Sequence, residues 1–165
     1  MPYNLLMLVP VEIASFAIDP MRNVPLIILK ELHGARTVPI PVGNTEASTI
    51  AMGSLDTASQ RPLAIDLVKN MMESLGGTLQ KVVISDFKDL TFYAHLYVCT
   101  DNSVRVIDCR PSDALSLSLR CDTQMFIDET VFEKTQPDYI SSPRDRLRKM
   151  IAERDTLNFG SHYLE

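Results

Sequence analysis

Three charged side chains that can act on a phosphate group, Asp108, Arg110 and Asp113, lie within six consecutive positions. The residues before them are typical of a strand, and Pro111 is typical of the first position of a helix. A strand that leads into a helix places these side chains beside free backbone N–H groups, which favour an anion. An arginine can hold a phosphate through two parallel hydrogen bonds, and an aspartate can bind a divalent cation or activate a water molecule. This turn is therefore the strongest candidate site in the sequence.

Each residue of the turn also has a structural interpretation. An acid such as Asp113 in the first helical turn stabilises a helix by about 0.3–1 kcal/mol without any chemistry. Asp108 and Arg110 can form an ion pair that only locks the turn. Ser112 has no histidine beside it in the sequence, so we expect its hydroxyl to bind phosphate and not to act as a nucleophile.

The elements that position this turn predict an α+β fold. We expect an internal duplication of two strand-strand-strand-helix-helix units, in which mixed sheets pack with helices, followed by a C-terminal helix. The first half has predicted strands at 5–18, 25–32 and 37–42 and predicted helices at 44–55 and 62–75. The second has predicted strands at 81–87, 92–99, 104–108 and 125–127 and predicted helices at 111–120 and 129–134. The domain would span 1–136, with repeats at about 5–76 and 77–136.

The duplication rests on an offset of 67 residues, which relates Leu29 to Leu96 and Glu46 to Asp113. By this interpretation, features that both halves share belong to the scaffold. The acid at position 113 is one of them, because Glu46 is its equivalent. Asp108 and Arg110 instead correspond to a proline and a glycine in the first half, so the repeat gives no scaffold reason for them.

Residues 137–165 form a predicted extension with a basic amphipathic helix at about 143–154. The segment 144–154 contains five basic and two acidic residues. Its apolar residues Leu147, Met150 and Ile151 make a narrow stripe. With the apolar stretch 2–11, this stripe predicts a homo-oligomer.

Charge and cysteine content narrow the class of protein. A net charge of -5 and a pI near 5.2 exclude a protein that coats nucleic acid through bulk charge. Three cysteines without a C-x-x-C pair favour free thiols and a cytoplasmic location. The apolar N-terminal run is broken by Pro10 and Glu12, so we expect a strand there and no membrane span.

The turn carries a resemblance to a known family. Its sequence, from Asp108 to Ala114, resembles the D-x-R-P-S-D-A signature of the bifunctional nuclease (BFN) domain family, also called DUF151. Further stretches resemble the family in the same order along the chain: 26–30, 92–94, and Arg61-Pro62 followed by Asp66 and Leu67.

The resemblance implies the duplicated fold and a nuclease that acts on DNA or RNA. It also implies roles for particular residues. Asp108, Asp113 and Asp66 would be catalytic, Arg110, Arg61 and Ser112 would bind phosphate, and Asp108 with Asp66 would hold a divalent metal such as Mg²⁺. Alternatively, Lys69 or Asn70 would satisfy Asp66 as an ordinary surface partner.

One position departs from the family. Its second motif usually reads R-P-x-x-H-D, whereas this chain has Ile65 at the histidine position. Histidine is the usual group for proton transfer near neutral pH, and His33, His95 and His162 are not obvious replacements. The alternative to a nuclease is therefore a non-catalytic regulatory module that binds an anion or a partner through the same residues.

Overall fold

The computed structural model describes residues 7–55, 61–101 and 103–135, so the predicted helix at 143–154 and residues 2–6 of the apolar stretch 2–11 lie outside the described residues. Apart from Thr135, the described residues belong to one compact unit, Met1–Lys134. Among them, no helix is long and apolar enough to cross a membrane.

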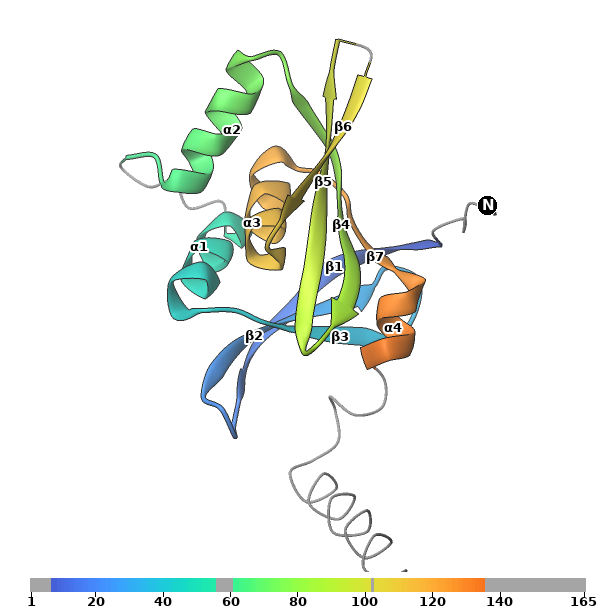
Figure 1. Ribbon diagram of the computed structural model, residues 1–165. Helices are drawn as coiled ribbons and strands as arrows, with labels where there is room; N and C mark the ends of the chain where they lie inside the picture. The colour runs from blue at the N-terminus through green and yellow to red at the C-terminus, as the bar shows by residue number, and fades with distance from the viewer. Residues whose placement is uncertain (1–6, 56–60, 102, 136–165) are drawn as a thin grey trace, which may run out of the picture. The chain divides into compact units, whose positions relative to one another are not determined.

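Seven strands form one mixed sheet in the order β3-β2-β1-β7-β4-β5-β6 (Figure 1). Neighbouring strands are antiparallel except β7 and β4, which are parallel. The strands are β1 (Leu8–Asp19), β2 (Val24–Glu31), β3 (Thr37–Pro41), β4 (Thr78–Lys88), β5 (Thr91–Thr100), β6 (Ser103–Cys109) and β7 (Met125–Asp128).

The helices are α1 (Asn44–Ser54), α2 (Ala64–Ser74), α3 (Pro111–Cys121) and α4 (Glu129–Thr135). Helix α3 packs on β4 and β5, and both α1 and α2 contact it. Figure 1 shows these three helices together on one side of the sheet, with α4 apart from them. Ala114, Leu115 and Leu117 of α3 are fully buried, so this helix forms the centre of the layer.

Strand β5 shows why the core forms where it does. Phe92, Ala94, Leu96 and Val98 alternate along it and are buried, because successive side chains of a strand point to opposite faces. The apolar face of β5 therefore meets α3, and the residues between lie on the other face.

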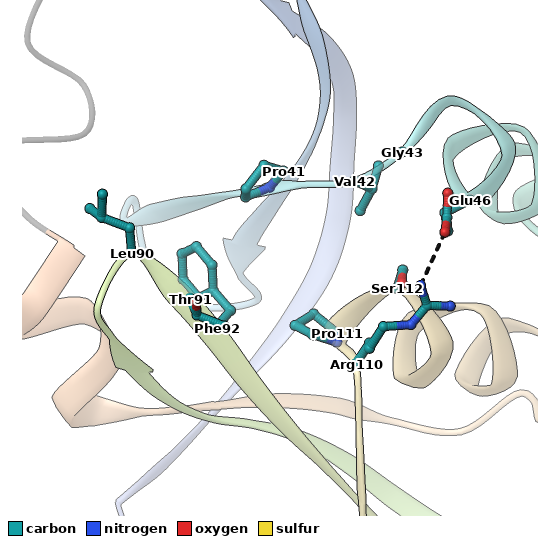
Figure 2. A pocket seen from close by; sticks show the side chains of 10 residues that line it. All are labelled: Pro41, Val42, Gly43, Glu46, Leu90, Thr91, Phe92, Arg110, Pro111 and Ser112. Atoms are coloured by element: carbon teal, nitrogen blue, oxygen red, sulfur yellow. Dashed lines mark hydrogen bonds and ion pairs between the residues drawn. The ribbon is translucent and has the colours of Figure 1, made fainter. Parts of the chain in front are cut away.

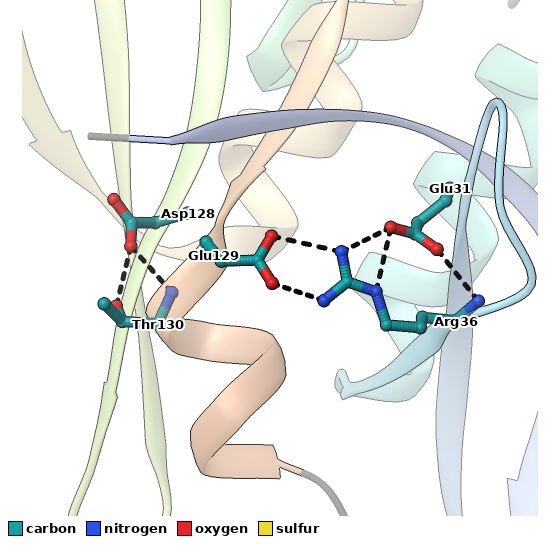
Figure 3. Close-up of polar contacts among 5 residues, drawn as sticks. All are labelled: Glu31, Arg36, Asp128, Glu129 and Thr130. Atoms are coloured by element: carbon teal, nitrogen blue, oxygen red, sulfur yellow. Dashed lines mark hydrogen bonds and ion pairs between the residues drawn. The ribbon is translucent and has the colours of Figure 1, made fainter. Parts of the chain in front are cut away.

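Helix α4 is tied to the β2–β3 hairpin by Arg36 (Figure 3). The guanidinium donates to both Glu31 and Glu129 and also lies over the Phe132 ring, 4.3 Å from its centroid. Because Glu129 and Phe132 belong to α4, this contact fixes the helix against a hairpin that lies 93 residues earlier.

The α+β prediction is confirmed, and the elements occur in the predicted order. The two halves, however, lie in one sheet and not in separate packed sheets. Strand β7 causes this difference, since Val9 pairs with Ile127 on one side of it and Ile84 pairs with Ile127 on the other. Backbone hydrogen bonds across β7 thus join the halves edge to edge.

Candidate functional site

The predicted turn forms as a strand end followed by a helix start. Arg110 is the N-cap residue of α3, with φ -73° and ψ 150°, and Pro111 follows at the first helical position. The carbonyl of Arg110 accepts the N–H groups of Asp113 and Ala114, each at 3.1 Å. No side chain caps this helix, so its N-terminus stays open toward the side chains around it.

Two carboxylates hold the Arg110 side chain. Its Nε and Nη2 atoms donate to the two oxygens of Asp113 at 2.9 and 3.0 Å, and Nη1 donates to Glu46 at 3.2 Å. Glu46 lies in the first turn of α1 and Asp113 in the first turn of α3, so one guanidinium joins the starts of two helices. Hydrogen bonding to Asp113 is the main cause that raises the pKa of Arg110.

The Arg110–Glu46 ion pair lies between two hollows. A hollow of about 290 Å³ on one side is shown in Figure 2, where Pro41, Gly43, Phe92 and Ser112 line it together with the ion pair. The larger cleft, about 540 Å³, lies between α1, α2, α3 and strands β5 and β6. Its apolar wall consists of Leu63, Ala64, Ile65, Val68, Leu96 and Leu117, and its polar rim of Glu46, Arg110, Asp113 and several hydroxyl groups.

Ser112 lines both hollows and is only 8% exposed. Arg110, in contrast, keeps 66% of its side chain exposed. The structure thus brings together three of the predicted site residues, Arg110, Ser112 and Asp113, at the mouth of the cleft.

Asp108 points elsewhere. It lines neither hollow, and its carboxylate lies 3.8 Å from Nε2 of His95, its cross-strand neighbour on β5. Cys109 lines the cleft, so Asp108, one residue earlier on the strand, faces the opposite side of the sheet. The alternative interpretation, an ion pair between Asp108 and Arg110, does not appear among the contacts of these two residues in the described chain.

Asp66 holds two helices together. It accepts the backbone N–H of Leu63 at 2.7 Å, at the start of α2, and Nε of Arg120 at 2.5 Å, at the end of α3. Burial opposes its charged form, but these two hydrogen bonds together with the positive charges of Arg120 and Lys69 lower the pKa of Asp66. Arg120 is the principal partner here, and not the expected Lys69 or Asn70; nothing in the sequence marks a residue 54 positions away as that partner.

Arg61 is exposed and lines neither hollow, so the structure does not place it beside Arg110 in the cleft. Ile65 does line the cleft, which sequence reasoning did not establish. Glu46 was visible in the sequence as the equivalent of Asp113, but not as a ligand of Arg110.

The predicted metal ligands do not form a metal site. Among residues 7–55, 61–101 and 103–135, no three His, Cys, Asp or Glu side chains converge in a way that could hold an ion. Asp66 is bound by Arg120, and Asp108 lies by His95. As placed here, these residues therefore do not fit a resident divalent metal.

All three cysteines are free, as the sequence predicts. Cys109 is the one on the cleft wall. Burial, with Asp113 and Asp108 nearby, raises the pKa of its thiol to about 12. A thiolate nucleophile is therefore not expected at this position near neutral pH.

Comparison with known proteins adds a family and two kinds of relative. The model of the bifunctional nuclease domain matches residues 27–139. An uncharacterized protein of Mycobacterium tuberculosis is 33% identical over 121 residues, which cover 73% of this chain and 72% of that protein. A protein of Oryza sativa subsp. indica named bifunctional nuclease 1 is 25% identical over 109 residues, 64% of this chain but only 33% of that protein.

Proposed function

Since this chain belongs to the bifunctional nuclease domain family, we propose that it is a nuclease that binds one nucleotide unit of DNA or RNA in the cleft. The observation that carries the proposal is the convergence of Arg110, Asp113 and Glu46 at the mouth of a cleft with an apolar wall. A volume of about 540 Å³ lies within the usual range for small-molecule sites.

The two ends of a nucleotide match the two parts of this cleft. A base would lie on the apolar wall near Ile65, Val68 and Leu96, since flat rings bury well against such side chains. The phosphodiester would then lie at the rim, where Arg110 retains N–H donors beyond the three that Asp113 and Glu46 accept. The acidic rim opposes an anion, so the phosphodiester binds more tightly if Arg110 releases one of its carboxylate contacts.

Hydrolysis would use groups of the rim. A water oxygen attacks phosphorus, the ester P–O bond breaks, and the leaving oxygen takes a proton from solvent. Asp113 accepts the proton of the attacking water, because its carboxylate lies next to the Arg110 donors that hold the phosphate. Arg110 stabilises the charge that develops on the phosphate oxygens.

A second candidate function is a non-catalytic module that binds nucleic acid or a partner without cleaving it. Ile65 favours this candidate, since an apolar side chain lines the cleft at the position where the family usually has a histidine. Without that imidazole, the described cleft lacks the group that most often transfers protons near neutral pH.

The test is a cleavage assay on labelled single-stranded DNA, double-stranded DNA and RNA, with EDTA and separately with Mg²⁺ or Mn²⁺. Anisotropy measures binding in the same samples. We expect Arg110→Lys to weaken both binding and cleavage, because lysine cannot make the planar two-point contact. Arg22→Lys, at an exposed turn, is the matched control.

Three results separate the candidates. Cleavage that falls in the Arg110→Lys protein but not in the control supports the nuclease. Binding without cleavage supports the second candidate. Both candidates are contradicted if the protein neither binds nor cleaves nucleic acid, or if its activity is the same in the Arg110→Lys variant.

We also infer that the rim arose from the duplication expected in the sequence. Helices α1 and α3 have the same length of 11 residues and begin 67 positions apart, at Asn44 and Pro111. Glu46 and Asp113 would then be equivalent acids that meet on Arg110, a residue of the second half. Superposition of the two halves in experimental coordinates tests this inference, and a failure of β3 to match β6 would end it.

A further inference from the structure

The two edges of the sheet differ in how well they are protected. Edge strand β3 has five residues, and two of them, Pro39 and Pro41, have no N–H to offer a further strand. Val38 and Ile40 of the same strand are fully buried. This edge is short, covered and poor in donors, which are the features that prevent sheets from associating.

Edge strand β6 is longer, and it lacks the prolines and the buried side chains of β3. It runs from Ser103 to Cys109 without a proline and pairs with β5 without a register shift. Val104, Val106 and Ile107 are 51%, 54% and 45% exposed. These residues point to both faces of the sheet, so the described chain leaves both faces of β6 exposed between Val104 and Ile107. A regularly paired edge strand with exposed apolar side chains can pair with another strand.

We propose that β6 pairs antiparallel with β6 of a second copy of this chain, which joins the two sheets into one. The twofold axis runs perpendicular to the sheet and passes Val106. This interface differs from the terminal segments that the sequence indicated, and it does not depend on whether the cleft hydrolyses a substrate.

The pattern of side chains on β6 favours a second copy as the partner. A perpendicular axis brings residues of the same face opposite each other, so Val106 meets Val106, Asp108 meets Val104, and Arg105 meets Ile107. No like charges are then directly opposed. An axis at Arg105 would oppose two guanidinium groups, which is destabilising. Val106 is also the midpoint of the strand, so all seven residues find a partner.

The pairing has a consequence for the cleft. Ser103 of the second copy lies opposite Cys109, and Cys109 is part of the cleft wall. Ser103 of one copy therefore lies beside the cleft wall of the other. The two clefts then lie on either side of the interface.

The first experiment measures the mass of the full chain by light scattering over a range of concentrations. We expect a dimer for the native protein and a monomer for Val106→Lys, because two ammonium groups would meet at the axis. Met21→Lys, at an exposed turn and 69% exposed, should remain a dimer. Circular dichroism checks that each variant is folded. A native monomer, or a Val106→Lys dimer held by another surface such as the exposed face of α2, overturns the proposal.

A second experiment tests the register with little change to the fold. Under mild oxidation, Val106→Cys should form a disulfide with itself across the axis, because directly opposed residues have Cα atoms about 4.5–5.5 Å apart. Val104→Cys is the matched control, since it is similarly exposed but lies opposite Asp108. Peptide mass spectrometry distinguishes the new bond from bonds of the native cysteines. Equal cross-linking at both positions, or none at position 106, contradicts this register and the proposed interface.

Discussion

Arg110 and Asp113 form a two-point ion pair within the first turn of α3, with N···O distances of 2.9 and 3.0 Å. Arg110, which precedes the helix, thus neutralises Asp113. Without Arg110, the charge of Asp113 would interact only with the helix N-terminus. Glu46 adds a second carboxylate from α1, so the rim carries a net negative charge although its central residue is an arginine. Arg110 therefore binds two carboxylates of the rim and still has N–H donors for an incoming anion.

Removal of either carboxylate should strengthen nucleic-acid binding. Glu46→Gln or Asp113→Asn leaves Arg110 freer and removes one negative charge from the rim. We expect about fivefold tighter binding of a single-stranded oligonucleotide, in line with ~1 kcal/mol for a partly exposed charge pair. Under the proposed mechanism, only Asp113→Asn should also reduce cleavage. Binding that is unchanged or weaker in both variants would show that the rim does not receive the phosphate.

Restoration of a histidine at position 65 should increase cleavage. Ile65 lines the cleft, so Ile65→His places an imidazole in it, and proton transfer by such a group is typically worth about 10²–10⁴-fold. We expect at least a tenfold gain, with a pH profile that rises through the titration of histidine near 6.5. Ile65→Gln is the control for polarity alone. An equal effect of both substitutions would argue against proton transfer at this position.

Asp66 should contribute mainly to stability. Asp66→Ala removes the partner of Arg120, whose side chain is only 11% exposed, and the hydrogen bond to the start of α2. We expect a loss of about 2–4 kcal/mol in the free energy of unfolding, measured in urea, because a nearly buried guanidinium loses its carboxylate partner and keeps only backbone carbonyl acceptors. Glu73→Gln, which removes a looser ion pair to Lys69 at 3.9 Å, should cost less than about 0.5 kcal/mol. Similar losses in both variants would contradict the assigned role.

The contact of Arg36 with Glu31 and Glu129 should make stability depend on acid pH. Hydrogen bonds from Arg36 lower the pKa of both carboxyl groups from the usual 4.5. A lowered folded pKa gives stability that is fully present above the unfolded pKa and is lost as the pH falls through the folded value. Arg36→Met removes this contribution, so the variant should be less stable by on the order of 1–2 kcal/mol near pH 7.

Thermal unfolding of both proteins between pH 7 and pH 3 tests this dependence. The stability gap between native protein and variant should stay constant above about pH 5 and narrow below the usual carboxyl pKa of 4.5. It should not close fully, because the contact of Arg36 with the Phe132 ring does not titrate. A gap that is independent of pH would show that the carboxylates contribute little.

The sequence by itself determined the elements of this fold and the residues of the turn. Helix α3 begins at Pro111 as predicted, since a proline at the first helical position costs no hydrogen bond and is preset for the helix. Strand β5 was visible in the alternation of apolar residues that face its core. These features are local, so neighbouring residues are sufficient to specify them.

Only the tertiary structure decided how these elements meet. Glu46, the second partner of Arg110, lies 64 residues earlier, and Arg120, the partner of Asp66, lies 54 residues later; no local pattern records such pairs. Helix α3 packs against β5 and α2 packs against α3, so the cleft between them is lined by Cys109 at the end of β6, while Asp108 faces away from it. Strand β7 joined the halves into one sheet because its backbone donors and acceptors are satisfied from both sides, by β1 and by β4.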